Sequence, residues 1–68
     1  MDPASARYLI RINGQLGDTL LSAFPAMAGQ RQGAETVLTG PLDQAALHGV
    51  LAEIEALGLE LLEVRQIP

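Results

Sequence analysis

The clearest hydrophobic pattern in this chain lies between Asp43 and Gly58. Apolar side chains recur there three and four residues apart, at Leu47, Val50, Leu51, Ile54 and Leu57. This spacing predicts an amphipathic helix with one buried stripe. Asp43 is placed to cap the start of the helix and Gly58 to end it, because glycine enters the left-handed conformation without steric cost.

Strands are predicted on both sides of this helix. Apolar and polar side chains alternate in Tyr8–Asn13, which is typical of a strand with one face on a core. Glu35–Thr39 has the β-branched composition of a strand, and Leu59–Ile67 is expected to form another after the helix. Gly40 is expected in the turn from strand to helix.

The region that follows the first strand has weaker patterns. Gly14–Gly17 is expected to form a turn, and Asp18 to cap a short helix over Thr19–Phe24. Residues 26–33 are the least informative part of the chain and could form a weak edge strand.

The resulting order of elements, βαββαβ, predicts an α+β fold of the ferredoxin-like kind. In this fold a four-stranded antiparallel sheet has both helices on one face. The first and third strands would lie in the middle of the sheet and the other two at its edges. We expect a flexible leader over residues 1–6 and a single domain over residues 7–68. A domain of this size buries only about 60 % of the surface of its unfolded chain, so its core is small.

The two faces of the predicted sheet differ in character. The face under the helices would consist of Tyr8, Ile10, Ile12, Leu38, Leu62 and Val64. On the other face, Arg11 and Glu63 could form an ion pair across neighbouring strands. Leu9, Val37 and Leu61 would share that open face, and three aliphatic side chains there favour a cover, most simply a second copy of the chain. The alternative is that they are single exposed aliphatic residues, which are ordinary.

Composition narrows the possible partners. The 68 residues carry a formal net charge of −4 and include no lysine, so a protein that binds a nucleic-acid backbone is not expected. No apolar run has the length of a membrane span, and the first residues lack the plan of a signal peptide. The chain has no cysteine, and we expect a cytoplasmic protein with no cofactor and no nucleic-acid or membrane partner.

No segment matches the pattern of a catalytic, cofactor or metal site. His48 is the only histidine, and Gln44 and Glu55 lie on the same flank of the predicted helix. These three residues are the candidates for a polar site. A zinc site needs three or four ligands, however, and a catalytic base needs a partner to orient it. A surface or interface histidine is the simpler interpretation, and an enzyme is less expected than a binding module.

Two glycine motifs favour structural roles. Gly14–Gly17 has the GxxG spacing of KH loops that clamp nucleic acids, but it contains no Lys or Arg and precedes Asp18. Gly49 lies within the predicted helix, where glycine costs about 1 kcal/mol relative to alanine. We expect Gly49 to mark the close approach of another backbone, either the sheet or a partner helix.

The segment from Leu38 to Val64 resembles a group of small bacterial proteins of unknown function that are frequent in actinobacteria. Those proteins share a TGP…DQAALHG…LGL-LL-V pattern, which this chain matches at Thr39–Pro41, Asp43–Gly49 and Leu57–Val64. Typical members have one more residue between the proline and the aspartate, and a tryptophan in the N-terminal half. The resemblance implies a shared fold and assigns no activity.

Three hypotheses about function remain. The first is a small soluble oligomeric interaction or assembly module, with a homodimer as the first guess. It would use Leu9, Val37 and Leu61, or the edge of the last strand, and a different protein partner is possible. The second is an ACT-like regulatory domain that senses a small molecule, which rests on analogy of fold. The third is an enzyme with a site at a dimer interface around His48.

Overall fold

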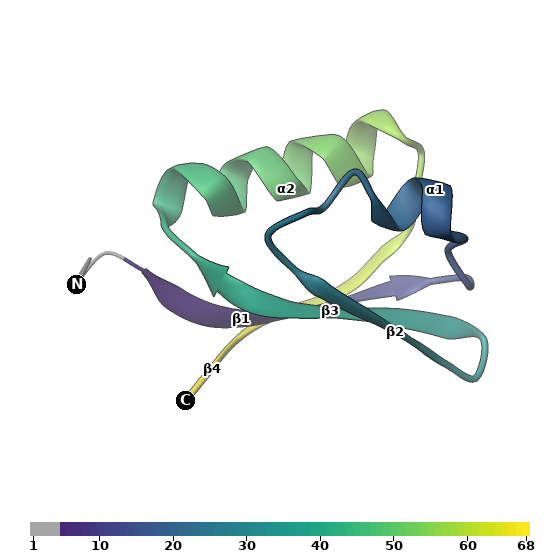
Figure 1. Cartoon of the computed structure of the whole chain (residues 1–68), viewed down its shortest axis with the longest axis horizontal. Coiled ribbons are helices and arrows are strands. Elements are labelled where there is room, and N and C mark those ends of the chain that lie inside the picture. The colour runs from purple at the N-terminus through teal and green to yellow at the C-terminus, as the bar shows by residue number, and fades with distance from the viewer. Residues whose placement is uncertain (1–4) are drawn as a thin grey trace.

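A computed structural model describes residues 5–68, which form a four-stranded antiparallel sheet with two helices over one of its faces (Figure 1). In chain order the elements are β1 (Ala6–Asn13), α1 (Asp18–Leu21), β2 (Ala28–Gln32), β3 (Glu35–Leu42), α2 (Gln44–Ala56) and β4 (Leu61–Ile67). The strands lie in the order β2-β3-β1-β4, so β1 and β3 are central. The predicted α+β class, with four antiparallel strands and two helices, is confirmed. Of the expected leader, residues 1–4 lie outside the described part, and Ala6 already belongs to β1.

α2 begins and ends as the sequence predicts. The Asp43 carboxylate accepts a hydrogen bond from the Ala46 N–H at 2.7 Å. At the other end Gly58 has a φ of +71°. The N–H groups of Gly58 and Leu59 donate back to the carbonyls of Glu55 and Ile54, at 3.0 and 3.1 Å, which is the pattern of a Schellman cap. The helix therefore stops at Ala56, and the chain turns directly toward β4.

The core lies between the two central strands and the helices. Ile54 is the only buried residue of α2. The rest of its apolar stripe is half-buried, except Leu57, which is 38 % exposed. Of the side chains predicted under the helices, Leu62 and Val64 of β4 are exposed, so β4 contributes less to the core than expected. The buried cluster consists of Ile10, Ile12, Leu16, Phe24, Leu38, Leu42 and Ile54.

A buried hydroxyl anchors the turn before α1. Thr36 of β3 has no exposed surface, and its Oγ1 donates to the Gly14 carbonyl at 2.7 Å and accepts from the Leu16 N–H at 3.0 Å. Arg31 of β2 donates from Nε to the Leu16 carbonyl at 2.9 Å. The expected turn over residues 14–17 is therefore fixed by side chains of the two neighbouring strands.

α1 differs from the prediction at both ends. It ends at Leu21, well before Phe24, although Phe24 is still buried in the turn that follows. Gly17 occupies the cap position, and no side chain caps the helix there. The Asp18 carboxylate instead accepts from Nη2 of Arg31 at 3.1 Å. The prediction that Asp18 caps this helix is wrong, because the chain enters the helix one residue earlier and the carboxylate pairs with another strand.

The glycine that packing requires is Gly40 rather than Gly49. β3 runs through Gly40 to Leu42, so Gly40 lies within the strand and not in a turn. A Cβ at Gly40 would lie 2.7 Å from the carbonyl oxygen of Ala26, because the segment after α1 crosses β3 there. A Cβ at Gly49 would meet nothing within 4 Å. The predicted turn at Gly40 is therefore wrong, and so is the approach of the sheet to Gly49. The approach of a partner helix to Gly49 stays a prediction.

A register shift in β4 changes the direction in which Leu61 faces. Glu63 lies opposite Arg11, and Leu61 lies opposite Ile12, so β4 holds one extra residue, Leu62, between these two pairs. Directly opposed residues of neighbouring strands share a face. Leu61 is therefore on the helix side with Ile12. Its predicted place on the open face is wrong, because a bulge interrupts the alternation of sides along a strand.

The two glycines give a matched pair of alanine variants. Gly40→Ala should lower the free energy of unfolding by about 1–3 kcal/mol, because the new methyl group collides with a backbone oxygen. Gly49→Ala should raise it by about 1 kcal/mol, because alanine is the better helix former and open space surrounds the site. Urea unfolding followed by circular dichroism measures both. Equal effects of the two variants would contradict this account of the packing.

Candidate interaction surface

The open face of the sheet has an ion-pair network at its centre. Arg11 of β1 donates from Nη1 to both carboxylate oxygens of Glu35 on β3, at 3.0 and 3.1 Å, and from Nε to Glu63 on β4 at 3.2 Å. Glu63 also lies 3.5 Å from Nε of Arg65. Hydrogen bonds from Arg11 to Glu35 first, and then to Glu63, raise the pKa of the guanidinium. The predicted pair of Arg11 and Glu63 is present, and Glu35 extends it over three strands.

The open face is less apolar than the sequence suggests. Val37 lies opposite Arg11 in the register of β1 and β3, yet it is only 8 % exposed. Leu9 is half-buried, and Leu61 faces the helices. Of the three residues expected to form an interface on this face, none is therefore an exposed aliphatic side chain there. An interface through Leu9, Val37 and Leu61 stays a prediction. The exposed aliphatic surface that motivated it is not found at these residues on the open face.

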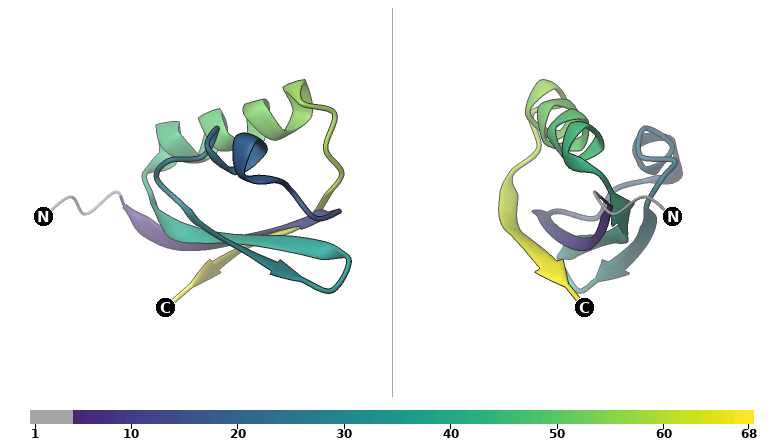
Figure 2. Two further views of the ribbon diagram at one scale, coloured as in Figure 1. Left: turned by 45° about the vertical axis from the view of Figure 1, so that its right-hand side comes forward. Right: turned by 90° about the vertical axis from the view of Figure 1, so that its left-hand side faces the viewer.

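Exposed apolar surface gathers instead at the end of α2 and on β4. Within residues 5–68 the large hydrophobic side chains with the greatest exposure are Leu57 at 38 %, Leu61 at 42 %, Leu62 at 37 % and Val64 at 37 %. We call these four residues the β4 apolar cluster. Seen end-on, β4 lies below α2 at one side of the molecule, whereas α1 lies on the other side (Figure 2). The cluster is therefore concentrated at a single edge of the fold.

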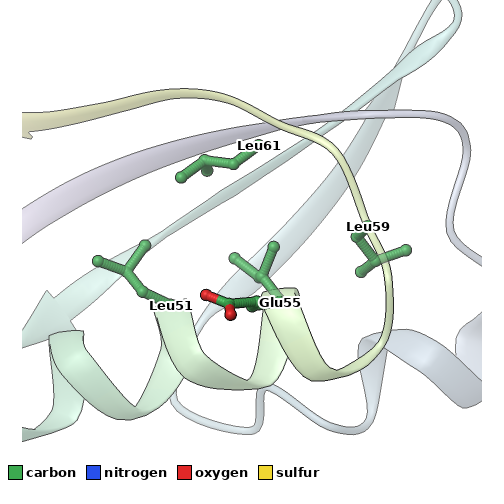
Figure 3. A pocket seen from close by; sticks show the side chains of 5 residues that line it. Leu51, Glu55, Leu59 and Leu61 are labelled. Atoms are coloured by element: carbon green, nitrogen blue, oxygen red, sulfur yellow. The ribbon is translucent and has the colours of Figure 1, made fainter.

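A shallow hollow separates α2 from β4. It has a volume of about 260 Å³ and is lined by Leu51, Ile54, Glu55, Leu59 and Leu61. Leu51 and Leu61 extend into it from opposite sides (Figure 3). Glu55 supplies the one charged group of its wall. The hollow exists because the α2 stripe faces an edge strand that covers it only in part.

β4 also offers a free backbone edge. Among the described strands it pairs only with β1. An unpaired strand edge carries N–H and C=O groups that can add a further strand. In this chain the free edge lies next to the β4 apolar cluster, so hydrogen-bonding groups and apolar surface occur together.

The polar candidates on α2 assemble only in part. Gln44 Nε2 and His48 Nε2 lie 3.3 Å apart on the exposed surface of the helix. Glu55 is seven residues farther along, which corresponds to about 10 Å of helix rise. It lines the hollow rather than joining the other two. The three residues therefore do not form one site within a single chain.

The GxxG segment has little freedom to hold a ligand. The Gly14 N–H donates to the Ala34 carbonyl at 2.7 Å and the Leu16 N–H to Thr36, so both groups already have partners. Within residues 5–68 no group of three or more histidine or acidic side chains could hold a metal ion. In the same part of the chain, no helix has the length and apolar character that crossing a bilayer requires.

The fold and this surface define a small α+β domain with one apolar edge. Residues 7–65 match a family described as a domain of unknown function, DUF8691. The chain belongs to this family. No curated protein and no solved structure matches it.

Sequence reasoning missed three members of the surface. Leu57 was expected in the buried stripe of the helix, and Leu62 and Val64 were expected under the helices, but all three are more than a third exposed. The predicted strand order already placed the last strand at the edge of the sheet. That position could have indicated that the side chains of this strand are less covered. An edge strand meets a helix from one side only, so its inward side chains are less covered than those of central strands.

The ion-pair network predicts a salt-dependent stability. Arg11→Gln should lower the urea midpoint of unfolding, because it leaves Glu35 without its ion-pair partner and Glu63 with Arg65 alone. The loss should shrink in molar salt, which screens charges at a partly exposed site. Arg7→Gln is the control, since Arg7 lies on the same strand and has no ion pair with any residue from 5 to 68. A loss that salt does not change would argue against the network.

Proposed function

We propose that this domain is a small assembly module that binds a second copy of itself. The observation that carries the proposal is the β4 apolar cluster, Leu57, Leu61, Leu62 and Val64, beside an unpaired strand edge. Single exposed aliphatic residues are ordinary, but four within eight positions at one edge are a typical contact surface. A small domain also gains stability when it buries such surface against a copy.

We also infer that the fold is ferredoxin-like. The strand order β2-β3-β1-β4 and the two helices over one face support this assignment (Figure 1). The cytoplasmic location and the bacterial origin expected from the sequence stay predictions. An enzyme around His48 gains no support from the arrangement of Gln44, His48 and Glu55.

A specific observation favours a second candidate function, the sensing of a small molecule. The hollow between α2 and β4 has apolar walls and one carboxylate, from Glu55. Its volume of about 260 Å³ is just below the range of about 300–1,000 Å³ that is usual for ligand pockets. Self-association needs no ligand and uses more of the exposed surface, so it is the preferred function.

Self-association is tested by sedimentation equilibrium of the wild-type chain over a range of concentrations. We expect a dimer, and we expect the double change Leu62→Gln and Val64→Gln to shift it toward monomer, because both side chains are exposed and their loss should spare the core. Leu9→Gln, on the open face, is the matched control and should leave the mass unchanged. A wild-type chain that is monomeric at millimolar concentration would refute the proposal.

The sensing function is tested by thermal shift with a panel of amino acids and nucleotides. A ligand that binds the hollow should raise the melting temperature of the wild-type chain. Leu51→Gln should reduce that rise, because Leu51 lines the hollow. A panel without any shift would remove this candidate.

A further inference from the structure

The hydrogen bonds of β1 determine which backbone groups of β4 are free. In an antiparallel sheet the N–H and C=O groups of a residue point to one neighbour, and those of the next residue to the other. The Gly14 N–H donates to Ala34 beside β3, and the Asn13 N–H donates to Glu60 beside β4. The odd-numbered residues of β1 therefore bond β4. Because Arg11 lies opposite Glu63 and Leu9 opposite Arg65, these two β4 residues bond β1.

The neighbouring residues of β4 turn their backbone groups outward. By the same alternation, Val64 and Gln66 direct their N–H and C=O groups to the free edge. Leu62 is the extra residue of the bulge, where this alternation is interrupted. A strand added at the edge must bond Val64 and Gln66. When a two-fold axis relates two identical antiparallel strands, one residue lies opposite the same residue of the second copy. In the three pairings nearest the middle of β4, this residue is 63, 64 or 65.

Charge distinguishes these three registers. Glu63 and Arg65 lie on the open face of the sheet, opposite Arg11 and Leu9 of β1. A register centred on residue 63 would place two Glu63 side chains opposite each other, and one centred on residue 65 would do the same for Arg65. Like charges directly opposite each other are destabilising. In the register centred on Val64, each Glu63 lies opposite Arg65 of the second copy.

The same register agrees with the positions of the apolar side chains. Val64 lies opposite Ile10 and therefore on the helix side of the sheet. A two-fold axis that joins two edge strands in one sheet is perpendicular to that sheet, so both α2 helices lie on the same face. Leu57 and Leu61 of the two copies, which also lie on the helix side, would then flank the paired Val64 residues. The pairing buries the β4 apolar cluster and at the same time gives the free N–H and C=O groups of β4 hydrogen-bond partners.

We propose that two copies of the chain pair antiparallel through β4, with Val64 opposite Val64 and each Glu63 opposite Arg65 of the second copy. The two four-stranded sheets become one continuous sheet with both α2 helices on the same face. This inference rests on the proposed self-association and specifies its register.

The absence of cysteine from the chain permits a direct test by single-cysteine variants. Bonded pairs of an antiparallel ladder have Cα atoms about 5.5 Å apart, within the range of a disulfide. Val64→Cys should therefore form a covalent dimer under mild oxidation. Leu62→Cys and Gln66→Cys should each stay monomeric on a non-reducing gel, because their own copies lie about 13 Å apart along the strand. A mixture of these two variants should give the mixed covalent dimer.

The possible results separate the register from the function. If sedimentation shows a dimer but Leu62→Cys or Gln66→Cys crosslinks to itself, the register is wrong and self-association stands. If sedimentation shows a dimer and no variant crosslinks, another surface carries the contact and this inference fails. If the wild-type chain is a monomer, both the proposed function and the register fail.

An independent measurement uses the charge pairs. Arg65→Glu should weaken the dimer by about tenfold at low salt, because it places two carboxylates opposite each other twice in the interface. High salt should reduce the loss. Arg7→Glu changes the net charge equally on the same face, but it lies on β1, one strand from the edge. Equal weakening by the two variants would overturn the proposed pairing of Glu63 with Arg65.

Discussion

The structure depends on the packing of α2 against the two central strands through Ile54. This one side chain of the helix is buried, and it joins Ile10, Ile12 and Leu38 in the core. The Asp43 cap and the glycine turn at Gly58 set where the helix begins and ends. Since the core is small, the remaining apolar residues of α2 need a cover that the chain itself provides only in part.

The bulge in β4 decides where that uncovered surface lies. Without the extra residue, Leu61 would alternate to the open face and the hollow beside α2 would lose one wall. With it, Leu61 faces α2, on the same side of the sheet as Val64. The open face keeps a charge-balanced network of Arg11, Glu35, Glu63 and Arg65. The charged groups of the open face are therefore paired within the chain. On the helix side, the edge formed by β4 has no such partners.

The sequence predicted the parts of this fold whose cause is local. The stripe and caps of α2 and the alternation of β1 follow from residue spacing, and the structure contains them. The pair of Arg11 with Glu63 followed instead from the predicted order of the strands. The errors concern longer-range effects. Asp18 meets Arg31 from another strand, Gly40 is crossed by the segment after α1, and Leu61 changes side through a bulge. For the last of these reasons the candidate surface is β4 rather than the open face. The edge of the last strand was the alternative that the sequence had already offered.

The position of β1 at the centre of the sheet has a consequence for how the domain forms. Of the described elements β1 is made first, yet it pairs with β3 on one side and on the other with β4, which is the last of them. Arg7 near the start lies opposite Ile67 near the end of the described chain. Such distant pairing slows folding, because the chain must close long loops before these contacts form. During synthesis β1 therefore keeps one edge unpaired until β4 has emerged, and in this interval the nascent domain is most open to incorrect strand pairing.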